Sequence, residues 1–144
     1  MNKKIDFLGI DIDALTMQET LAKIESCIAD KIQIHHSVVN AGKVVLMKND
    51  KNLEKNVLEA NLINADGQAI VWAASFLGKS LPERVAGIDL MENLVEKSFQ
   101  KGYKCFFFGA KERVVSKVVK KYSKLYFENI IAGYRNGFFN SIEE

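Results

Sequence analysis

The sequence predicts an α/β protein with a mostly parallel sheet and helices on both of its faces. Two observations support this class. Short β-branched or aromatic runs alternate with helical patterns along the chain, and 48% of the 144 residues are hydrophobic with a single proline. Strands that alternate with helices form crossover units in which successive strands run parallel. The length suits one domain, and the composition excludes a disordered or low-complexity chain.

The first half of the chain begins with an apolar strand at residues 5–10. Thr16 and Glu19 form a capping box that predicts the start of a helix. Residues 32–39 are rich in β-branched side chains and predict a second strand, which ends at Asn40, a good helix N-cap. A third, brief strand is predicted at residues 62–65.

Two further helices are expected around this third strand. Asp50 or Asn52 suits the N-cap of the first, and the second covers residues 68–77. Trp72 and Phe76 lie at helical spacing in the second helix, which favours a place in the core over a stacking site.

The second half of the chain repeats the alternation. Residues 89–100 and 111–126 have helical patterns, and residues 103–108 form an aromatic run typical of a strand buried on both faces. A last strand is predicted at residues 129–132, followed by a turn-prone loop at residues 133–137. Together these elements predict a single Rossmann-like domain.

Several classes of protein and site are disfavoured by composition. The longest uncharged stretch, residues 67–78, is shorter than a membrane span needs, and acidic residues interrupt any signal-peptide pattern after Lys3 and Lys4. Cys27 and Cys105 show no metal-ligand spacing and are expected to be buried thiols. A net charge of +2 gives no indication of nucleic-acid binding. We therefore expect a cytoplasmic protein.

The positive charge is concentrated in one segment. Residues 101–124 contain eight basic residues against Glu112 alone, a local charge of +7. Five of these side chains share one side of the predicted helix: Arg113, Lys117, Lys120, Lys121 and Lys124. A solvated face is the default interpretation, and attraction to anionic lipid is the functional alternative.

Candidate site residues follow the predicted strands, because parallel α/β sheets bind ligands beyond the carboxyl ends of their strands. Asp66 follows the third predicted strand and is a candidate base for a substrate hydroxyl, and Asn40 follows the second. Either residue also suits an ordinary turn or helix cap.

Other candidates are a backbone loop, an arginine and a pair of histidines. The strand, glycine and helix start at residues 108–111 can hold a phosphate or serve packing alone. Arg84 can clamp a diphosphate or pair with Glu83 or Asp89. His35 and His36 must face opposite sides of their strand, and without a third ligand they indicate no metal site.

Five segments, in order, resemble the WecG/TagA/CpsF glycosyltransferases, glycosyltransferase family 26. They are Asn40-Ala41, Asn64-Ala65-Asp66-Gly67, the run from Pro82 to Met91, Phe108-Gly109-Ala110-Lys111, and Gly133 to Phe139. The resemblance implies transfer of N-acetylmannosamine or a related sugar from a UDP donor. The acceptor would be N-acetylglucosamine on an undecaprenyl diphosphate lipid, in the synthesis of teichoic acid or another surface polysaccharide.

The resemblance also implies an inverting mechanism that needs no metal or other cofactor. Asp66 matches the proposed general base of the family, and Arg84 matches a pocket arginine that stabilises charge. Asn40 matches a pocket asparagine. The remaining residues expected to bind substrate are Gly67, Gln68, Gly87, Asp89, Gly109, Ala110, Lys111 and Gly137.

The chain departs from the family pattern at two places. Val38 stands where the family commonly has threonine, and the stretch from Gly133 to Phe139 keeps its glycines but lacks both family histidines. These departures indicate a divergent member of the family. A different donor sugar is the consequence that they suggest.

Length is a third departure, because family members continue beyond this point. Ser141 to Glu144 form a capping box, which predicts the start of a helix at the last residues of the sequence. We therefore expect residues 1–144 to be the N-terminal part of a longer domain. The resemblance implies peripheral association with the inner face of the cell membrane, and an open strand edge favours self-association. The alternative is a nucleotide-binding or interaction module without transferase activity.

Overall fold

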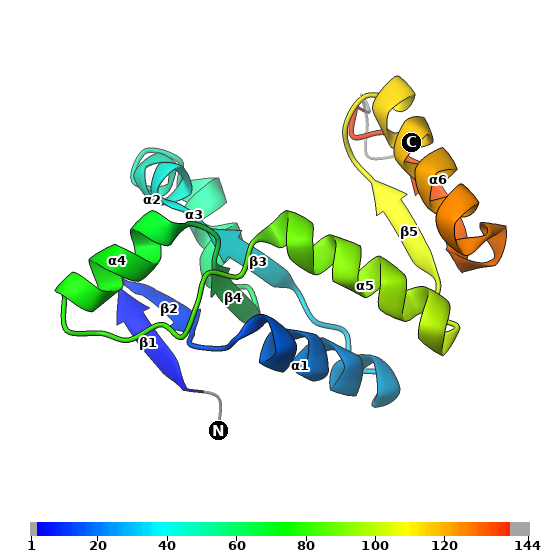
Figure 1. Ribbon diagram of the computed structural model, residues 1–144. Helices are drawn as coiled ribbons and strands as arrows, with labels where there is room; N and C mark the ends of the chain where they lie inside the picture. Colours follow the sequence, from blue (N-terminus) through cyan, green and yellow to red (C-terminus); the bar gives the residue numbers. More distant parts are fainter. Residues whose placement is uncertain (1–2, 139–144) are drawn as a thin grey trace. The chain divides into compact units, whose positions relative to one another are not determined.

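The computed structural model describes residues 3–138. The chain divides into two compact units, Met1–Leu90 and Met91–Glu144. Each unit contains one parallel pair of strands (Figure 1). Each also has a hydrophobic cluster of its own.

The first unit contains most of the helices and strands. In chain order they are β1 (Lys4–Phe7), β2 (Ile10–Asp13), α1 (Met17–Ala29), β3 (His36–Val39), α2 (Ala41–Met47), α3 (Lys51–Leu58), β4 (Leu62–Ala65) and α4 (Gln68–Phe76). The predicted capping box is present at the start of α1, where the Glu19 N–H donates to the Thr16 hydroxyl. Asn40 caps α2 and Asp50 caps α3. The N-caps predicted at Thr16 and Asn40 are therefore confirmed.

The beginning of the chain differs from its prediction. Residues 5–10 are not one strand, because Leu8 and Gly9 form a tight turn with positive φ angles of 54° and 85°. The turn joins β1 and β2 as an antiparallel hairpin in which Phe7 pairs with Ile10. Gly9 tolerates a positive φ at little cost, and its N–H donates to the Asp6 carboxylate over 3.0 Å. The second strand is shorter than the predicted range 32–39, because only His36–Val39, which is β3, forms a strand.

Strands β3 and β4 form the parallel pair of this unit. His36 pairs with Leu62 and Val39 with Ala65, so both strands end at the same level. All four residues of β4 are buried. The Asp13 carboxylate of β2 accepts the Ile63 N–H over 3.0 Å, which attaches the hairpin to β4. A buried polar group thus links two small sheets.

Helix α4 departs from its predicted burial. Ile70 and Ala74 face the core, whereas Trp72 and Phe76 are 68% and 92% exposed. The prediction that these two aromatic residues belong to the core is wrong within this unit. Residues 70 and 74 are one helical turn apart, and they take the buried side of the helix instead.

The second unit pairs two strands beside a long helix. Helix α5 (Gly87–Lys101) begins in the first unit and is followed by β5 (Cys105–Phe108), α6 (Glu112–Tyr126), a short 3₁₀ turn (Glu128–Ile130) and β6 (Ile131–Arg135). Helix α6 lies along β5 (Figure 1), and Phe107 stacks on Tyr122 with ring centroids 5.6 Å apart. The core of the unit forms around Val95, Tyr122 and Ile130.

Three predictions for this unit need correction. Strand β5 is not buried on both faces, because Phe106 and Phe108 are 60% and 61% exposed while Phe107 packs on α6. The last strand begins at Ile131 and includes Gly133 to Arg135, which were expected to form a loop. Pairing with β5 explains the change, since Phe108 is in register with Arg135. Cys105 is only partly buried, whereas Cys27 is buried as predicted.

The α/β class is confirmed. Each crossover connects parallel strands, β3 to β4 and β5 to β6. The strands are distributed over three two-stranded sheets, and the first of these is the antiparallel hairpin. Among the described helices, none combines the length and apolar character required to cross a membrane. The capping box expected at Ser141 to Glu144 and the family-like Phe139 lie outside the described residues.

Candidate active site

The carboxyl ends of β3 and β4 bring Asn40 and Asp66 together. The two strands end in register at Val39 and Ala65, and the Asp66 N–H donates to the Val39 carbonyl over 2.7 Å. A Cβ atom added to Gly67 would lie only 3.5 Å from the Cβ of Asn40. The register of two short strands therefore places Asn40 and Asp66 at one edge, and the sequence predicts each of them at a strand end.

The Asn40 side chain has a structural role at this edge. Its Oδ1 accepts the Lys43 N–H over 2.9 Å, which caps helix α2. This bond occupies the carbonyl end of the amide and holds its orientation. Its amino end has no partner among residues 3–138 and remains able to donate to a ligand.

Asp66 is half-buried at the end of a fully buried strand. Within the described part of the chain, its carboxylate has no hydrogen-bond or ion-pair partner. Gly87 approaches it closely, since a Cβ atom added there would lie 3.8 Å from Asp66 Oδ2. The absence of a side chain at Gly87 keeps one side of the carboxylate open. An unpaired carboxylate in such a position can accept a proton from a bound hydroxyl.

Val38 forms an apolar wall next to this carboxylate. Its two methyl carbons lie 3.4 and 3.7 Å from the Cβ position of Gly87, which makes Val38 a neighbour of the candidate base. Ser37 lies on the opposite side of the strand, because successive strand residues alternate. The hydroxyl that the family commonly places at position 38 is thus replaced by methyl groups in this chain.

Arg84 is connected to the same edge through its neighbours. The Val85 N–H donates to the Ala65 carbonyl over 2.9 Å, directly before Asp66. The Arg84 guanidinium lies 3.3 Å from the Asp89 carboxylate in the first turn of α5, and both side chains are about half exposed. Glu83 does not pair with Arg84 and instead accepts the Met17 N–H over 2.5 Å at the start of α1. These bonds fix both sides of the loop that carries the guanidinium.

Gln68 is the first residue of α4 and is exposed. Gly67 precedes it at the N-cap position with no side-chain cap. The first N–H groups of α4 therefore point to the edge that carries Asp66, where they are available to a ligand.

The second unit gathers the other expected substrate-binding residues. The Gly109 N–H donates to the Arg135 carbonyl over 3.0 Å, and the Gly137 N–H donates to the Ala110 carbonyl over 2.9 Å. Gly109 has a φ of 129° and Ala110 one of 57°, both in the region that favours glycine. A Cβ atom on Gly137 would lie 3.1 Å from Gly109 Cα. Glycine at 137 therefore allows this close approach, which a side chain would widen by a few tenths of an ångström.

Lys111 immediately precedes α6 and makes no side-chain capping bond. Its carbonyl accepts the Val114 N–H over 2.8 Å. Lys111 is exposed, so its ammonium group and the free N–H groups of the first helical turn share one positive helix end. This is the arrangement that the sequence predicts for a phosphate contact.

The sequence analysis did not predict a hydrogen-bonded group formed by His36, Asn64 and Thr20. His36 Nε2 lies 3.0 Å from Asn64 Oδ1, and Asn64 Nδ2 donates to the Thr20 hydroxyl over 3.2 Å. Asn64 and Thr20 are completely buried. Burial lowers the pKa of His36 below its ordinary value of 6.5. An asparagine within an apolar strand was the available signal, because a buried amide requires hydrogen-bond partners.

Between residues 3 and 138, no group of three or more His, Cys, Asp and Glu side chains is placed to hold a metal ion. The expectation of a metal-independent reaction stays a prediction.

Comparison with known proteins gives the family. Residues 5–144 match the model of the glycosyl transferase WecG/TagA/CpsF family. The chain belongs to this family. The resemblance stated from the five sequence segments is thereby confirmed over nearly the whole chain.

Two relatives are named N-acetylglucosaminyldiphosphoundecaprenol N-acetyl-beta-D-mannosaminyltransferase. The protein from Bacillus spizizenii is 34% identical over 79 residues, which is 55% of this chain and 31% of that protein. The protein from Staphylococcus aureus strain NCTC 8325 is 28% identical over 145 residues, 98% of this chain and 56% of that protein. The chain therefore spans about half the length of the Staphylococcus relative.

Proposed function

We propose that the chain contributes to transfer of N-acetylmannosamine or a related sugar from a UDP donor to N-acetylglucosaminyl-diphospho-undecaprenol. The relatives' names supply the acceptor and the transferred sugar. The structural observation that supports the proposal is the unpaired, half-buried Asp66 carboxylate at the shared end of β3 and β4. Synthesis of teichoic acid or another cell-surface polysaccharide is the corresponding cellular process.

In the proposed reaction Asp66 is the general base. Its carboxylate removes the proton of the acceptor hydroxyl while that oxygen attacks the anomeric carbon of the donor. The bond from this carbon to the UDP oxygen breaks, and the attack from the opposite side inverts the configuration. The neighbouring Asn40 amide can donate a hydrogen bond that orients the sugar.

Charge on the departing diphosphate requires stabilisation, and Arg84 is the residue that we assign to it. Its guanidinium is about half exposed and is anchored by Asp89 and Val85. Arginine matches a diphosphate because it can donate two parallel hydrogen bonds. In this scheme the guanidinium replaces a metal ion, so we expect activity to resist chelators. Gly67, Gln68 and Gly87 line the same edge.

We assign the loop of Gly109, Ala110, Lys111 and Gly137 to the nucleotide. The support is its tight glycine contact and the exposed helix end at Lys111. Backbone N–H groups at a helix end favour an anionic phosphate. This assignment concerns the second unit alone.

The acceptor is a lipid, so we also propose that the protein works at the cytoplasmic face of the cell membrane. Four exposed cations of α6 share one side of the helix, namely Arg113, Lys117, Lys120 and Lys124. Such a stripe is attracted to anionic lipid headgroups. Self-association through the exposed face of β5 is a further expectation, which light scattering would test.

Sugar transfer by an Asp66→Asn variant is the direct test. We expect a loss of about 10²–10⁴-fold in turnover, because the amide cannot accept the proton. The assay follows a radiolabelled sugar from UDP-N-acetylmannosamine to the lipid acceptor. It uses the chain extended to the length of its relatives. Asp11→Asn is a matched control, since Asp11 is an exposed strand residue far from the β3 and β4 ends in sequence.

The alternative is a nucleotide-binding module without transfer. Val38 favours it, because a methyl group replaces a hydroxyl beside Asp66. UDP binding by the extended protein with no transfer would support this alternative, and transfer that is unchanged in Asp66→Asn would remove the proposed base.

A further inference from the structure

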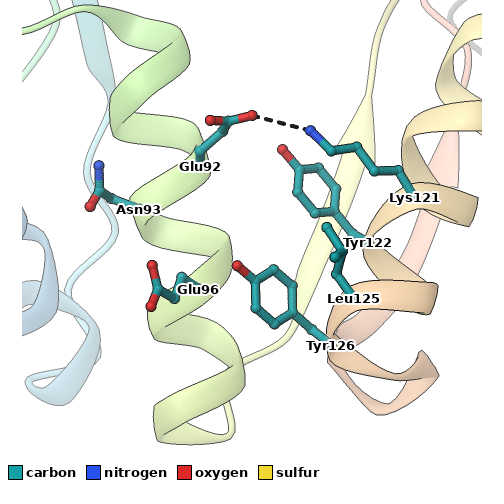
Figure 2. A pocket seen from close by; sticks show the side chains of 7 residues that line it. All are labelled: Glu92, Asn93, Glu96, Lys121, Tyr122, Leu125 and Tyr126. Atoms are coloured by element: carbon teal, nitrogen blue, oxygen red, sulfur yellow. Dashed lines mark hydrogen bonds and ion pairs between the residues drawn. The ribbon is translucent and has the colours of Figure 1, made fainter.

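A pocket of about 320 Å³ lies between α5 and α6, within the second unit and outside the residues assigned to the nucleotide. Figure 2 shows Glu92 and Glu96 on α5 opposite Lys121, Tyr122, Leu125 and Tyr126 on α6. The volume is at the lower end of the range for small-molecule sites, about 300–1,000 Å³.

One wall of the pocket is aromatic. The rings of Tyr122 and Tyr126 are nearly parallel, with centroids 6.4 Å apart and an interplanar angle of 17°. Phe107 stacks on Tyr122 from behind, and Phe99 contacts Tyr126 at 5.5 Å. Both tyrosine rings are therefore held in place by other aromatic residues, and the wall is formed before any ligand arrives.

Tyr122 presents an unusual hydroxyl. The residue is only 4% exposed, and its hydroxyl has no hydrogen-bond partner among residues 3–138. Figure 2 shows this hydroxyl and that of Tyr126 directed across the gap toward α5. The hydroxyl oxygen itself is accessible from the pocket although the ring is buried, so it is available to pair with a ligand's polar group.

The charges around the pocket argue against a cationic ligand. The Lys121 ammonium lies 3.2 Å from Glu92 and 5.1 Å from the centre of the Tyr122 ring. The chain itself thus provides the cation that this wall would attract. Glu96 accepts one hydrogen bond from Gln100 over 3.2 Å, which leaves its second oxygen available.

From these features we infer that the groove between α5 and α6 is a second carbohydrate site, which takes one neutral pyranose ring. The flatter C–H face of the sugar would lie on Tyr126 and Leu125, because Phe107 and Lys121 cover the Tyr122 ring, while its hydroxyls pair with Glu96 and the Tyr122 hydroxyl. Aromatic surface combined with a few polar groups of both kinds suits a ligand that is apolar on one face and polar at its rim. The inference depends on the geometry of the second unit and does not depend on the proposed transfer reaction.

The test is a titration of the isotope-labelled chain with methyl β-D-glucoside and with N-acetylglucosamine, followed by amide chemical shifts. We expect saturable shifts in α5 and α6 with at least one of these sugars. Sorbitol, which has similar hydroxyls but no ring face, should cause none. No saturable shift with either sugar, or shifts with tetramethylammonium in place of sugar, would overturn the inference.

Variants separate the contributions of ring and hydroxyl. Tyr122→Phe keeps the ring stack and should weaken sugar binding about fivefold, the value of one hydrogen bond. Glu96→Gln should weaken it by a similar factor. Tyr134→Phe is the matched control, because Tyr134 lies on β6 outside the pocket. Sugar binding by Tyr122→Phe and by Glu96→Gln that is as tight as that of the unchanged chain would contradict the site.

The same titration distinguishes this site from the proposed nucleotide site. UDP should not displace the sugar from α5 and α6, and Tyr122→Phe should bind UDP as the unchanged chain does. Sugar shifts confined to residues near Asp66 would assign the binding to the proposed active site and overturn this inference, without affecting the proposed function.

Discussion

The two parallel strand pairs end in different kinds of edge. The β3 and β4 edge presents side chains, an amide at Asn40 after β3 and a carboxylate at Asp66 after the completely buried β4. The β5 and β6 edge presents backbone, with Gly137 in contact with Gly109 and Ala110. The first kind of edge can move a proton, and the second can bind an anion through N–H groups. Under the proposed function, the first edge would supply the base and the second the phosphate contacts, each from its own unit.

The edges also differ in what supports them. Strand β4 is attached by buried polar side chains, Asp13 on one side and the Asn64 and Thr20 pair on the other. The β5 and β6 edge depends on close approach of backbone at Gly137, where an added Cβ would force Gly109 and Ala110 to shift. We therefore expect the first edge to be sensitive to loss of polar groups and the second to addition of a single methyl group.

The largest effect on stability is expected at Asp13. Asp13→Ala leaves the buried Ile63 N–H without an acceptor, and we expect the free energy of unfolding to fall by about 1–3 kcal/mol. Urea denaturation measures this value. Asp11→Ala, on the exposed side of the same strand, should change it little. Equal effects of the two substitutions would show that the polar anchor does not support β4.

A smaller loss is expected at Gly137. The added Cβ of Gly137→Ala would lie 3.1 Å from Gly109 Cα and 3.3 Å from the Ala110 nitrogen. Relief of this contact requires the loops to separate, at a cost of about 1–2 kcal/mol. Thermal unfolding would report the change.

Gly42→Ala is the control in the first unit. Its Cβ would meet only Asn40 Oδ1, at 3.4 Å, within helix α2, so we expect a gain of about 0.5–1 kcal/mol. If Gly137→Ala were equally well tolerated, the two edges would not differ in the way we describe.

The smallest effect concerns pH and the His36 pair with Asn64. Burial lowers the pKa of His36 in the folded state below 6.5, so the unfolded state takes up a proton first as the pH falls. The contribution of neutral His36 to stability is complete above pH 6.5 and is lost as the pH falls from there toward the folded pKa. Unfolding free energies from about pH 8 to about pH 5 should therefore fall more steeply for the unchanged chain than for His36→Gln.

His35→Gln is the control for this experiment, because His35 is exposed on the neighbouring position. It should keep the pH dependence of the unchanged chain. Identical curves for all three proteins would show that His36 does not carry the effect.

Much of the first edge could be predicted because its signals are local. Short stretches of sequence are enough to predict a buried strand that stops at Asp66-Gly67 and an N-cap at Asn40. The register of β3 and β4 then brings the two residues to one edge. Of the two carboxylates considered as partners for Arg84, the structure pairs it with Asp89, and the diphosphate role stays a prediction. The family resemblance supplied the roles of these residues, which spacing alone leaves open.

The failures have a different physical origin. Periodicity reports which residues are apolar, but the burial of Trp72, Phe106 and Phe108 depends on whether another element covers their side. The strand at Gly133 to Arg135 is stabilised by pairing with β5, which no local pattern contains. The Tyr122 pocket likewise depends on how α5 and α6 pack against each other, which no local pattern contains.

Binding of UDP, measured by calorimetry, tests the central claim most directly. We expect the chain to bind UDP with and without a chelator, and Arg84→Ala to weaken binding about tenfold or more through loss of a charge-assisted hydrogen bond. Lys23→Ala, which removes an exposed cation of α1, should bind as the unchanged chain does. Equal affinity of Arg84→Ala would contradict the assignment of Arg84 to the diphosphate of UDP. No binding by the folded chain would contradict the presence of a sugar-nucleotide site within these residues.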